Sequence, residues 1–251
     1  MSCFGDRDAK AAQVVTGDLT RRLTAEAIGT AMLLAAVVGS GIMATRLSGG
    51  NDAIALLANT IATAAALVAL ILTFGCISGA HFNPAVSMAD AWQGGLRWRE
   101  VPAYTLAQLI GAVMGVWVAH LMFGERLLML SLRPRSGPAQ MVSEFVATFG
   151  LLSVIRGCSR HRSDAVPFAV AAYIAAAYWF TASTSFANPA VTVARALTDT
   201  FAGIRPVDVP GFVVAQLAGA AAATLLFRWL VPSLPQSTDG VVVPRSAMSR
   251  S

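Results

Sequence analysis

The sequence contains little charge and almost no lysine. Only 12% of its 251 residues are Asp, Glu, Lys or Arg, about half of what soluble domains carry. Lys10 is the only lysine and the arginines are scattered, so no basic tract predicts binding to nucleic acid. The apolar residues, 56% of the chain, fall in long blocks, and the mean hydropathy is +0.64. These features argue against a cytosolic enzyme and predict a polytopic membrane protein.

Cysteine and histidine are also sparse, with three residues of each. Cys3, Cys76 and Cys158 are expected in or facing the cytoplasm, where disulfides are rare. They are either inert or thiols that could bind trivalent arsenic. His120 and His161 have no neighbouring ligand residues, so neither a metal site nor a cofactor is expected. No Ser–His or Cys–His arrangement lies at a matching depth, so we expect no enzyme activity.

Six blocks are long and apolar enough to cross a bilayer, which requires about 20 helical residues. They are approximately Leu23–Thr45, Asp52–Phe74, Val101–Phe123, Ala139–Arg156, Val166–Thr181 and Pro210–Val231. When both termini are placed inside, most of the 18 positive residues also fall inside. This positive-inside bias predicts that both termini are cytoplasmic.

The chain contains an internal repeat. The motif Asn83-Pro84-Ala85-Val86 recurs as Asn188-Pro189-Ala190-Val191. Glu26 precedes the first motif and Gln108 follows it, as Glu144 and Gln216 flank the second. Because each half holds three spans, the two copies must enter the membrane from opposite sides, which is an inverted repeat. The predicted division is a cytoplasmic N-terminal tail (1–22), a first repeat (23–123), an extracytoplasmic linker (124–138), a second repeat (139–231) and a cytoplasmic C-terminal tail (232–251).

Each motif is expected to begin a short helix, because Asn is a preferred N-cap and Pro a preferred first helical residue. Only about ten helix-compatible residues follow each motif, too few to cross a bilayer. Two half-helices whose N-termini meet at the centre create a positive potential that disfavours cations. The amides of Asn83 and Asn188 would then be free to face a pore, which the carbonyls of the preceding segments also line. The predicted fold is an all-α membrane protein of six transmembrane helices and two re-entrant half-helices.

This pattern resembles the major intrinsic protein family, the aquaporins and aquaglyceroporins, over roughly Leu23 to Val231. Both Asn-Pro-Ala motifs, both glutamates and both glutamines match. The resemblance implies a homotetramer in membrane lipid with one pore in each subunit. It also implies passive conduction of small neutral solutes.

The sequence departs from the family at the expected selectivity filter. Most members have an arginine three residues after the second motif's Asn, where this chain has Val191. Gapless spacing places the other filter residues at Thr63, Ala176 and Ser185. All four side chains are small, which predicts a widened filter. The family resemblance implies that such a filter passes water, glycerol-like polyols and metalloid hydroxides such as arsenous acid. The segment 185–191 resembles a bacterial subgroup often linked to arsenic resistance, which implies a bacterial inner membrane.

Four further residues have two possible roles each. Arg195 lies one helical turn beyond Val191, so it is either a displaced filter arginine in the vestibule or an interfacial residue that binds loop carbonyls. His81 lines the pore, either passively or as a pH-sensitive group. Glu26 and Glu144 either accept hydrogen bonds from the segments before the motifs or contact solute.

Two other functions remain open. A strict water channel would share every feature except the width of the filter. A secondary transporter also uses inverted repeats and broken helices. It would normally carry more membrane-embedded charges than Glu26 and Glu144.

Overall fold

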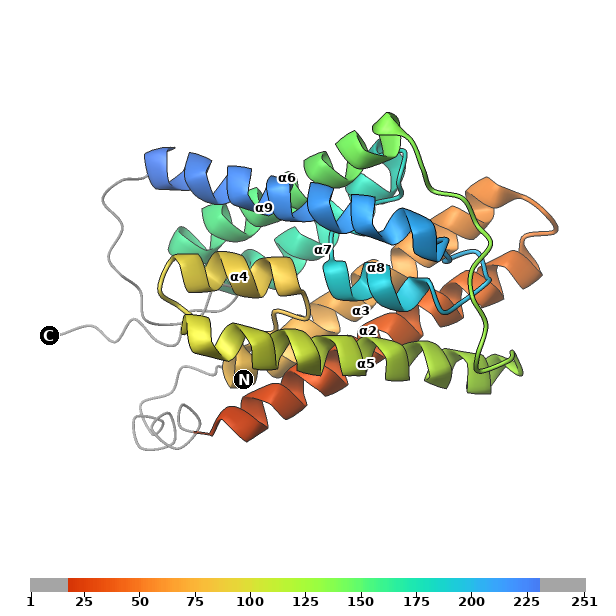
Figure 1. The fold of residues 1–251 in the computed structure, drawn as a ribbon, viewed down its shortest axis with the longest axis horizontal. Helices are drawn as coiled ribbons and strands as arrows, with labels where there is room; N and C mark the ends of the chain where they lie inside the picture. Colours follow the sequence, from red (N-terminus) through yellow and green to blue (C-terminus); the bar gives the residue numbers. More distant parts are fainter. Residues whose placement is uncertain (1–17, 231–251) are drawn as a thin grey trace, which may run out of the picture.

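The computed structural model describes residues 18–230, apart from the side chains of Arg160 and His161, and this part of the chain contains helices and no strand (Figure 1). Cys3, most of the predicted N-terminal tail and all of the predicted C-terminal tail lie outside the described residues. The long helices are α2 (Leu19–Leu47), α3 (Asp52–Ser78), α5 (Val101–Phe123), α6 (Pro138–His161), α7 (Val166–Phe180) and α9 (Val209–Leu230). The short helices are α4 (Pro84–Trp92) and α8 (Pro189–Arg195), with single turns at Trp98–Glu100, Ser163–Ala165 and Pro206–Asp208.

Six of the helical segments in the described part are long and apolar enough to span a membrane, which confirms the predicted all-α fold. The first begins at Leu19 rather than Leu23, because the Asp18 side chain caps it by accepting a hydrogen bond from the Thr20 N–H. The second continues to Ser78, where Gly79 adopts a left-handed conformation (φ 91°) and ends the helix. The third has the predicted bounds.

The two half-helices begin where the motifs predict. The Asn83 and Asn188 side chains cap them by accepting hydrogen bonds from the N–H groups of Ala85 (2.9 Å) and Ala190 (3.0 Å). Proline occupies the first helical position of each. The helices contain nine and seven residues, so the second is clearly shorter than the ten or so expected. Neither can cross a bilayer.

The long helices pack in pairs within each half. α2 packs on α5 and α6 packs on α9, while α3 and α7 join the two halves. α2 and α5 approach each other closely at Gly111, whose position leaves no room for a Cβ against the backbone carbonyl of Ala27. Gly219 of α9 faces the carbonyl of Phe145 on α6 in the same way. Small residues permit such close approach between membrane helices.

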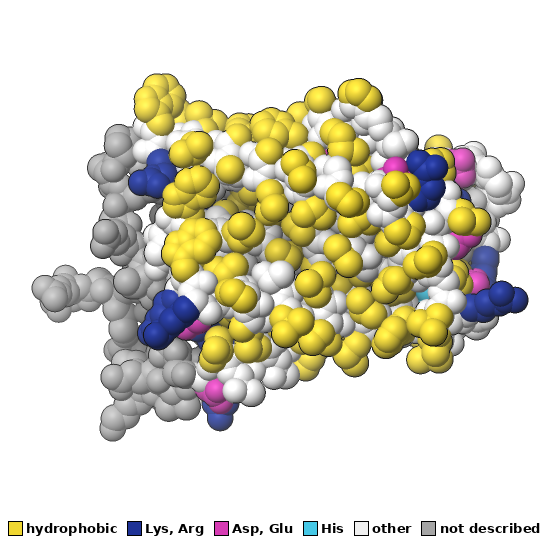
Figure 2. Space-filling model, in the orientation of Figure 1, with side chains coloured by type: hydrophobic (Ala, Val, Ile, Leu, Met, Phe, Trp, Pro, Cys, Tyr) yellow, Lys and Arg dark blue, Asp and Glu magenta, His cyan; other side chains and the backbone are white. Residues whose placement is uncertain are grey.

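The two ends of the bundle are called the terminal end and the linker end. The terminal end carries Leu19 and Leu230, and the linker end is crossed by the linker, residues 124–137 (Figure 1). In Figure 2 apolar side chains cover the flank between the ends, while arginines and carboxylates gather at the ends. Exposed apolar residues on the flank include Ile61, Leu121 and Val214. Such a girdle of apolar side chains suits contact with lipid.

The close packing at Gly111 predicts a specific sensitivity. Gly111→Ala should destabilise the protein by about 1 to 3 kcal/mol, because the new methyl group overlaps a backbone carbonyl that cannot move aside. Thermal unfolding in detergent would measure this. Gly157→Ala on α6 is the matched control, since a Cβ there would lie in ordinary contact, 3.9 Å from the Phe227 ring. An unchanged melting temperature for Gly111→Ala would contradict the close approach of α2 and α5.

Candidate functional site

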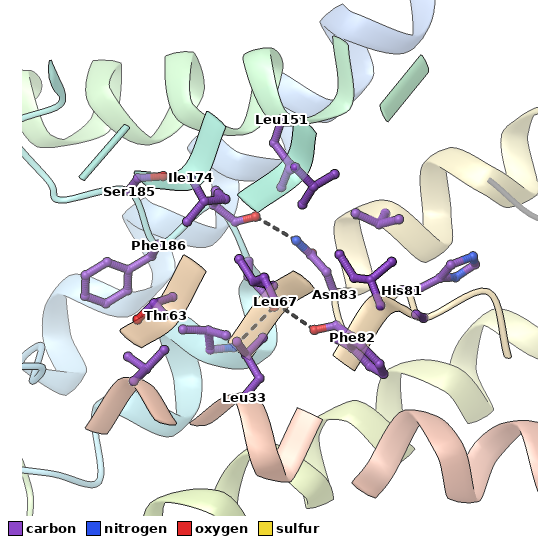
Figure 3. A pocket seen from close by; sticks show the side chains of 18 of the residues that line it. Leu33, Thr63, Leu67, His81, Phe82, Asn83, Leu151, Ile174, Ser185 and Phe186 are labelled. Atoms are coloured by element: carbon purple, nitrogen blue, oxygen red, sulfur yellow. Dashed lines mark hydrogen bonds between the residues drawn. The ribbon is translucent and has the colours of Figure 1, made fainter. Parts of the chain in front are cut away.

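The two half-helices meet with their N-termini facing each other near the middle of the bundle. The Asn83 side-chain amide donates to the carbonyl of Ala187, and the Asn188 amide donates to the carbonyl of Phe82, both at 2.7 Å (Figure 3). The expectation that both amides are free is therefore wrong for one hydrogen of each. The physical reason is that a carbonyl at this depth needs a donor that lipid cannot supply. These two bonds link the halves.

The segments before the motifs, residues 78–82 and 183–187, are the approach segments of the two half-helices. Five of their non-glycine residues have left-handed backbone angles, with φ between 48° and 60°: Ala80, Phe82, Thr184, Ser185 and Ala187. This conformation is uncommon for residues with a Cβ and is strained. The surrounding structure must therefore hold both segments in place.

A cavity of about 70 Å³ lies where the half-helices meet, with room for several water molecules. Apolar side chains from α2, α3, α6 and α7 line one side, and the approach segments line the other (Figure 3). Polar groups are few along this lining. They belong to Thr63, His81, Asn83, Tyr178, Ser185, Asn188 and Arg195.

Two fully buried glutamates hold the approach segments. Each carboxylate accepts two backbone N–H bonds from the approach segment of its own half. The donors are His81 and Phe82 (2.9 and 2.7 Å) for Glu26, and Phe186 and Ala187 (both 2.9 Å) for Glu144. Neither glutamate is among the described residues that line the cavity.

Two glutamines complete these networks, a role that their repetition in the sequence did not predict. The Gln108 amide donates to Glu26 (2.8 Å) and to the hydroxyl of Ser87 on α4 (3.0 Å). Gln216 donates to Glu144 (2.6 Å) and to the hydroxyl of Thr192 on α8 (2.8 Å) in the same way. The same order of Glu, motif and Gln in both halves is the signal that could have identified them.

The structure corrects the expected filter residue of the fifth span. Ala176 is exposed on the outside of α7, whereas Ile174 and Tyr178 line the cavity. Residues 174 and 178 share a helix face, and residue 176 lies about 200° from 174 around the helix. Gapless spacing therefore missed the pore-facing side. The Tyr178 hydroxyl donates to the Thr63 hydroxyl at 3.4 Å.

The remaining three expected filter residues, Thr63, Ser185 and Val191, all line the cavity, and so does Arg195. The Arg195 guanidinium is buried and lies against the ring of Phe186, with its Cζ 3.4 Å from the ring centroid. Its Nε donates to the carbonyl of Ala202. No carboxylate among the described residues forms an ion pair with it.

A second arginine, Arg135, reaches this region from the linker. Its Nε donates to the carbonyl of Gly203 (2.8 Å), and its Nη1 donates to the carbonyl of Ser183 (2.9 Å). Burial, followed by the nearby charge of Arg133, lowers the pKa of Arg135 to about 10, so it stays charged at neutral pH. Sequence reasoning missed it, because it lies in the linker, outside both motifs.

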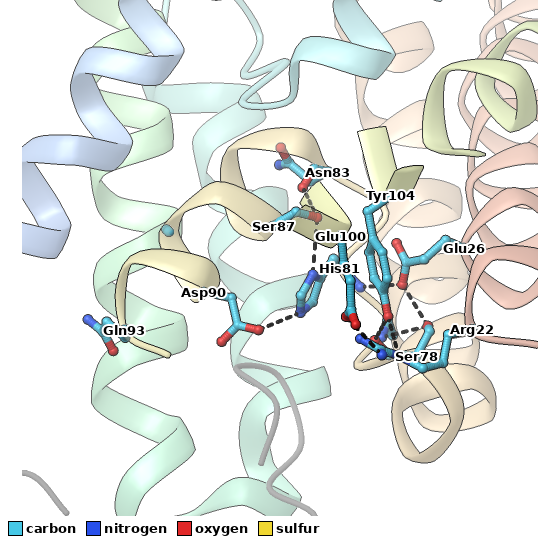
Figure 4. Close-up of polar contacts among 12 residues, drawn as sticks. Arg22, Glu26, Ser78, His81, Asn83, Ser87, Asp90, Gln93, Glu100 and Tyr104 are labelled. Atoms are coloured by element: carbon cyan, nitrogen blue, oxygen red, sulfur yellow. Dashed lines mark hydrogen bonds and ion pairs between the residues drawn. The ribbon is translucent and has the colours of Figure 1, made fainter. Parts of the chain in front are cut away.

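His81 lies on the terminal-end side of the motifs. Its Nδ1 is 3.1 Å from the Ser87 hydroxyl, and its Nε2 is 3.4 Å from the buried carboxylate of Asp90 (Figure 4). Asp90 was not predicted. Arg156 also lies on this side, where it donates to the carbonyl of Ala89. No group of three metal-ligating side chains occurs in the part of the chain that the structure describes.

Comparison with known proteins identifies the family. The family model for "Major intrinsic protein" matches residues 13–166 and 156–250. "Aquaglyceroporin AqpS" of Rhizobium meliloti (strain 1021) is 58% identical over 219 residues, which cover 87% of this chain and 94% of that relative. "Aquaporin NIP1-1" of Zea mays is 35% identical over 230 residues, covering 89% and 80%.

A solved structure has the same fold. The aquaglyceroporin from Plasmodium falciparum superposes with a TM-score of 0.66 over 86% of this chain and 97% of that one, at 19% identity. The fold, the paired motifs and these sequence matches lead to one conclusion. The chain belongs to the major intrinsic protein family and is a passive membrane channel for small neutral solutes, not an enzyme.

Proposed function

We propose that this channel is of the aquaglyceroporin type, passing water, glycerol-like polyols and metalloid hydroxides such as arsenous acid. The observation that carries the proposal is Val191, a short apolar side chain at the place where the family usually has an arginine. The similarity of the chain to a relative named as an aquaglyceroporin supports the same proposal. Arsenous acid is a small, neutral trihydroxy molecule, comparable in shape to glycerol.

Val191, Thr63 and Ser185 form the proposed filter together. The Val191 side chain has no hydrogen-bond donor, so it does not bond the oxygens of a solute as an arginine would. It is also shorter than arginine and leaves more of the opening free. The Ser185 hydroxyl is buried and has no hydrogen-bond partner among the described residues, so it is available to a solute hydroxyl. A polyol therefore meets one polar and one apolar wall here, which suits its hydroxyl and CH faces.

The crossed asparagines provide the next polar groups along the proposed path. A side-chain amide has two N–H donors, and Asn83 and Asn188 each use one of them between the halves. The second can bond a passing oxygen. The N-termini of α4 and α8 also point at this place, and their partial positive charges disfavour cations.

Arg195 is proposed to act in the vestibule at the linker end. It lies one turn beyond Val191 on α8, and its positive charge has no ion-paired carboxylate among the described residues. We expect it to attract polar solutes to the mouth without closing the filter. We propose His81 as a lining residue at the other mouth.

A homotetramer in the bacterial inner membrane, with both termini cytoplasmic, completes the proposal. The apolar flank supports membrane insertion (Figure 2), and the distribution of the positive residues supports the orientation.

A strict water channel is the second candidate. The cavity of about 70 Å³ and the position of the Tyr178 ring beside Thr63 favour it, because both limit the width of the path.

Substitution of Val191 separates the two candidates. Val191→Arg should lower glycerol and arsenous acid permeability about tenfold, since it adds a bulky donor group to the filter and raises the barrier by about 1.4 kcal/mol. Water permeability should fall much less. Stopped-flow light scattering on proteoliposomes measures all three, and Val191→Ala is the control that keeps the opening. A wild-type protein that passes water but neither solute would be a strict water channel.

Substitution of Arg195 tests the vestibule role. Arg195→Leu should lower glycerol and arsenous acid uptake about threefold, because the mouth loses guanidinium N–H groups that can donate hydrogen bonds to the hydroxyl oxygens of these solutes. Arg126→Leu serves as the control, since Arg126 is an exposed arginine of the linker. Unchanged uptake by correctly folded Arg195→Leu protein would refute the vestibule role and leave carbonyl binding as its function.

A further inference from the structure

The inverted repeat allows each residue of one half to be compared with its counterpart in the other. Tyr104 lies four residues before Gln108, and its counterpart Phe212 lies four residues before Gln216. Both rings are fully buried. The Tyr104 hydroxyl donates to the carbonyl of Ser78 at 3.1 Å, at the start of the first approach segment (Figure 4). Phe212 has no hydroxyl, so the second half needs another donor.

Ser183 is the counterpart of Ser78, because each lies five residues before its motif asparagine. Ser183 is fully buried, and an unbonded carbonyl in such a place is costly. Its carbonyl accepts the 2.9 Å hydrogen bond from Nη1 of Arg135. A linker arginine thus supplies the hydrogen bond that a tyrosine hydroxyl supplies in the first half.

The two halves differ in how this donor is held. In the first half, the Tyr104 hydroxyl accepts from Arg22 Nε (2.8 Å), and Arg22 Nη1 is 3.0 Å from Glu100 Oε2. In the second half, the matching acid Asp208 accepts from the side chain of Arg205 (3.0 and 3.2 Å) and from the backbone N–H of Arg135 (2.8 Å). Arg205 thus pairs with the acid, while Arg135 donates directly to the carbonyl that a tyrosine hydroxyl binds in the first half.

Arg135 also ties the second approach segment to its surroundings. Its guanidinium bonds Gly203 in the loop after α8 (2.8 Å), lies 3.4 Å from the Thr184 hydroxyl, and has its Cζ 4.9 Å from the Phe186 ring centroid. Thr184 and Ser185 have left-handed backbone angles, a strained conformation that persists only where other contacts hold it.

We propose that Arg135 is the positioning residue of the filter: by bonding the Ser183 carbonyl it fixes the second approach segment and with it the Ser185 side chain, and so sets the size of solute that passes. The inference rests on the proposed function, in which Ser185 lines the filter. It assigns no solute contact to Arg135 itself.

Removal of the guanidinium should loosen solute selection. In proteoliposomes, Arg135→Leu should raise the ratio of xylitol to glycerol permeability about threefold to tenfold, the range expected for the loss of one net hydrogen bond. Arg133→Leu is the matched control. Its guanidinium comes from the same linker but lies over the Phe201 ring, so the ratio should stay at the wild-type value.

A second-site substitution tests the symmetry argument directly. Adding Phe212→Tyr to Arg135→Leu places a hydroxyl at the counterpart of Tyr104, and the permeability ratio should return to within about twofold of wild type. Tyrosine restores neither the charge nor the bulk of Arg135. A ratio that stays high in the double variant would therefore contradict the hydrogen-bonding role and favour a purely electrostatic or steric one.

Failure of the proposed function and failure of this inference would give different results. Absence of glycerol flux in the wild type would refute the proposed function, whereas wild-type glycerol flux with an unchanged ratio in Arg135→Leu would refute only this inference. If Arg135→Leu does not reach the membrane, Arg135→Lys replaces it. Lysine keeps the charge but lacks the planar fork that reaches two carbonyls, so the ratio should still rise, by about twofold, and an unchanged ratio would overturn the inference.

Discussion

The structure depends on hydrogen bonds to the irregular backbone of the two approach segments in the middle of the membrane. The approach segments carry five left-handed residues and end at half-helices that stop inside the bundle. Lipid supplies no hydrogen bonds there, so every donor and acceptor must find a partner in the protein or the pore. Glu26 and Glu144 bind the backbone N–H groups from one side. The carbonyls of Phe82 and Ala187 accept from the opposite motif's asparagine. The pore is a consequence of this arrangement, because such backbone is tolerated only beside a polar path.

The two halves of the repeat share this hydrogen-bonded framework, but the residues at the two mouths of the pore differ. Asp90 and Arg195 occupy matching places, seven residues after the motif asparagines. Asp90 lies beside His81, and Arg195 lies against Phe186, which is the counterpart of His81. The inverted symmetry thus places a carboxylate near the terminal end and a guanidinium near the linker end. Each mouth has its own chemistry, while the centre is nearly symmetric.

Much of the fold could be predicted from the sequence, because hydropathy over about 20 residues and the Asn-Pro cap are local signals. The spans and the starts of both half-helices follow from them. The filter was harder, because a position on a helix face cannot be found by counting residues across a loop. Ala176 was misplaced for this reason, and Tyr178 faces the cavity instead. Arg135 could not be found at all, because its role arises only when the linker folds over the second approach segment.

Passive passage of solutes through this pore can be tested by the concentration dependence of glycerol entry. Wild-type proteoliposomes would be exposed to increasing glycerol gradients, with and without an imposed proton or sodium gradient. In a passive channel, the rate rises in proportion to the glycerol gradient and does not respond to either ion gradient. A rate that saturates and follows an ion gradient would contradict it, and would instead identify a secondary transporter built on the same inverted repeat.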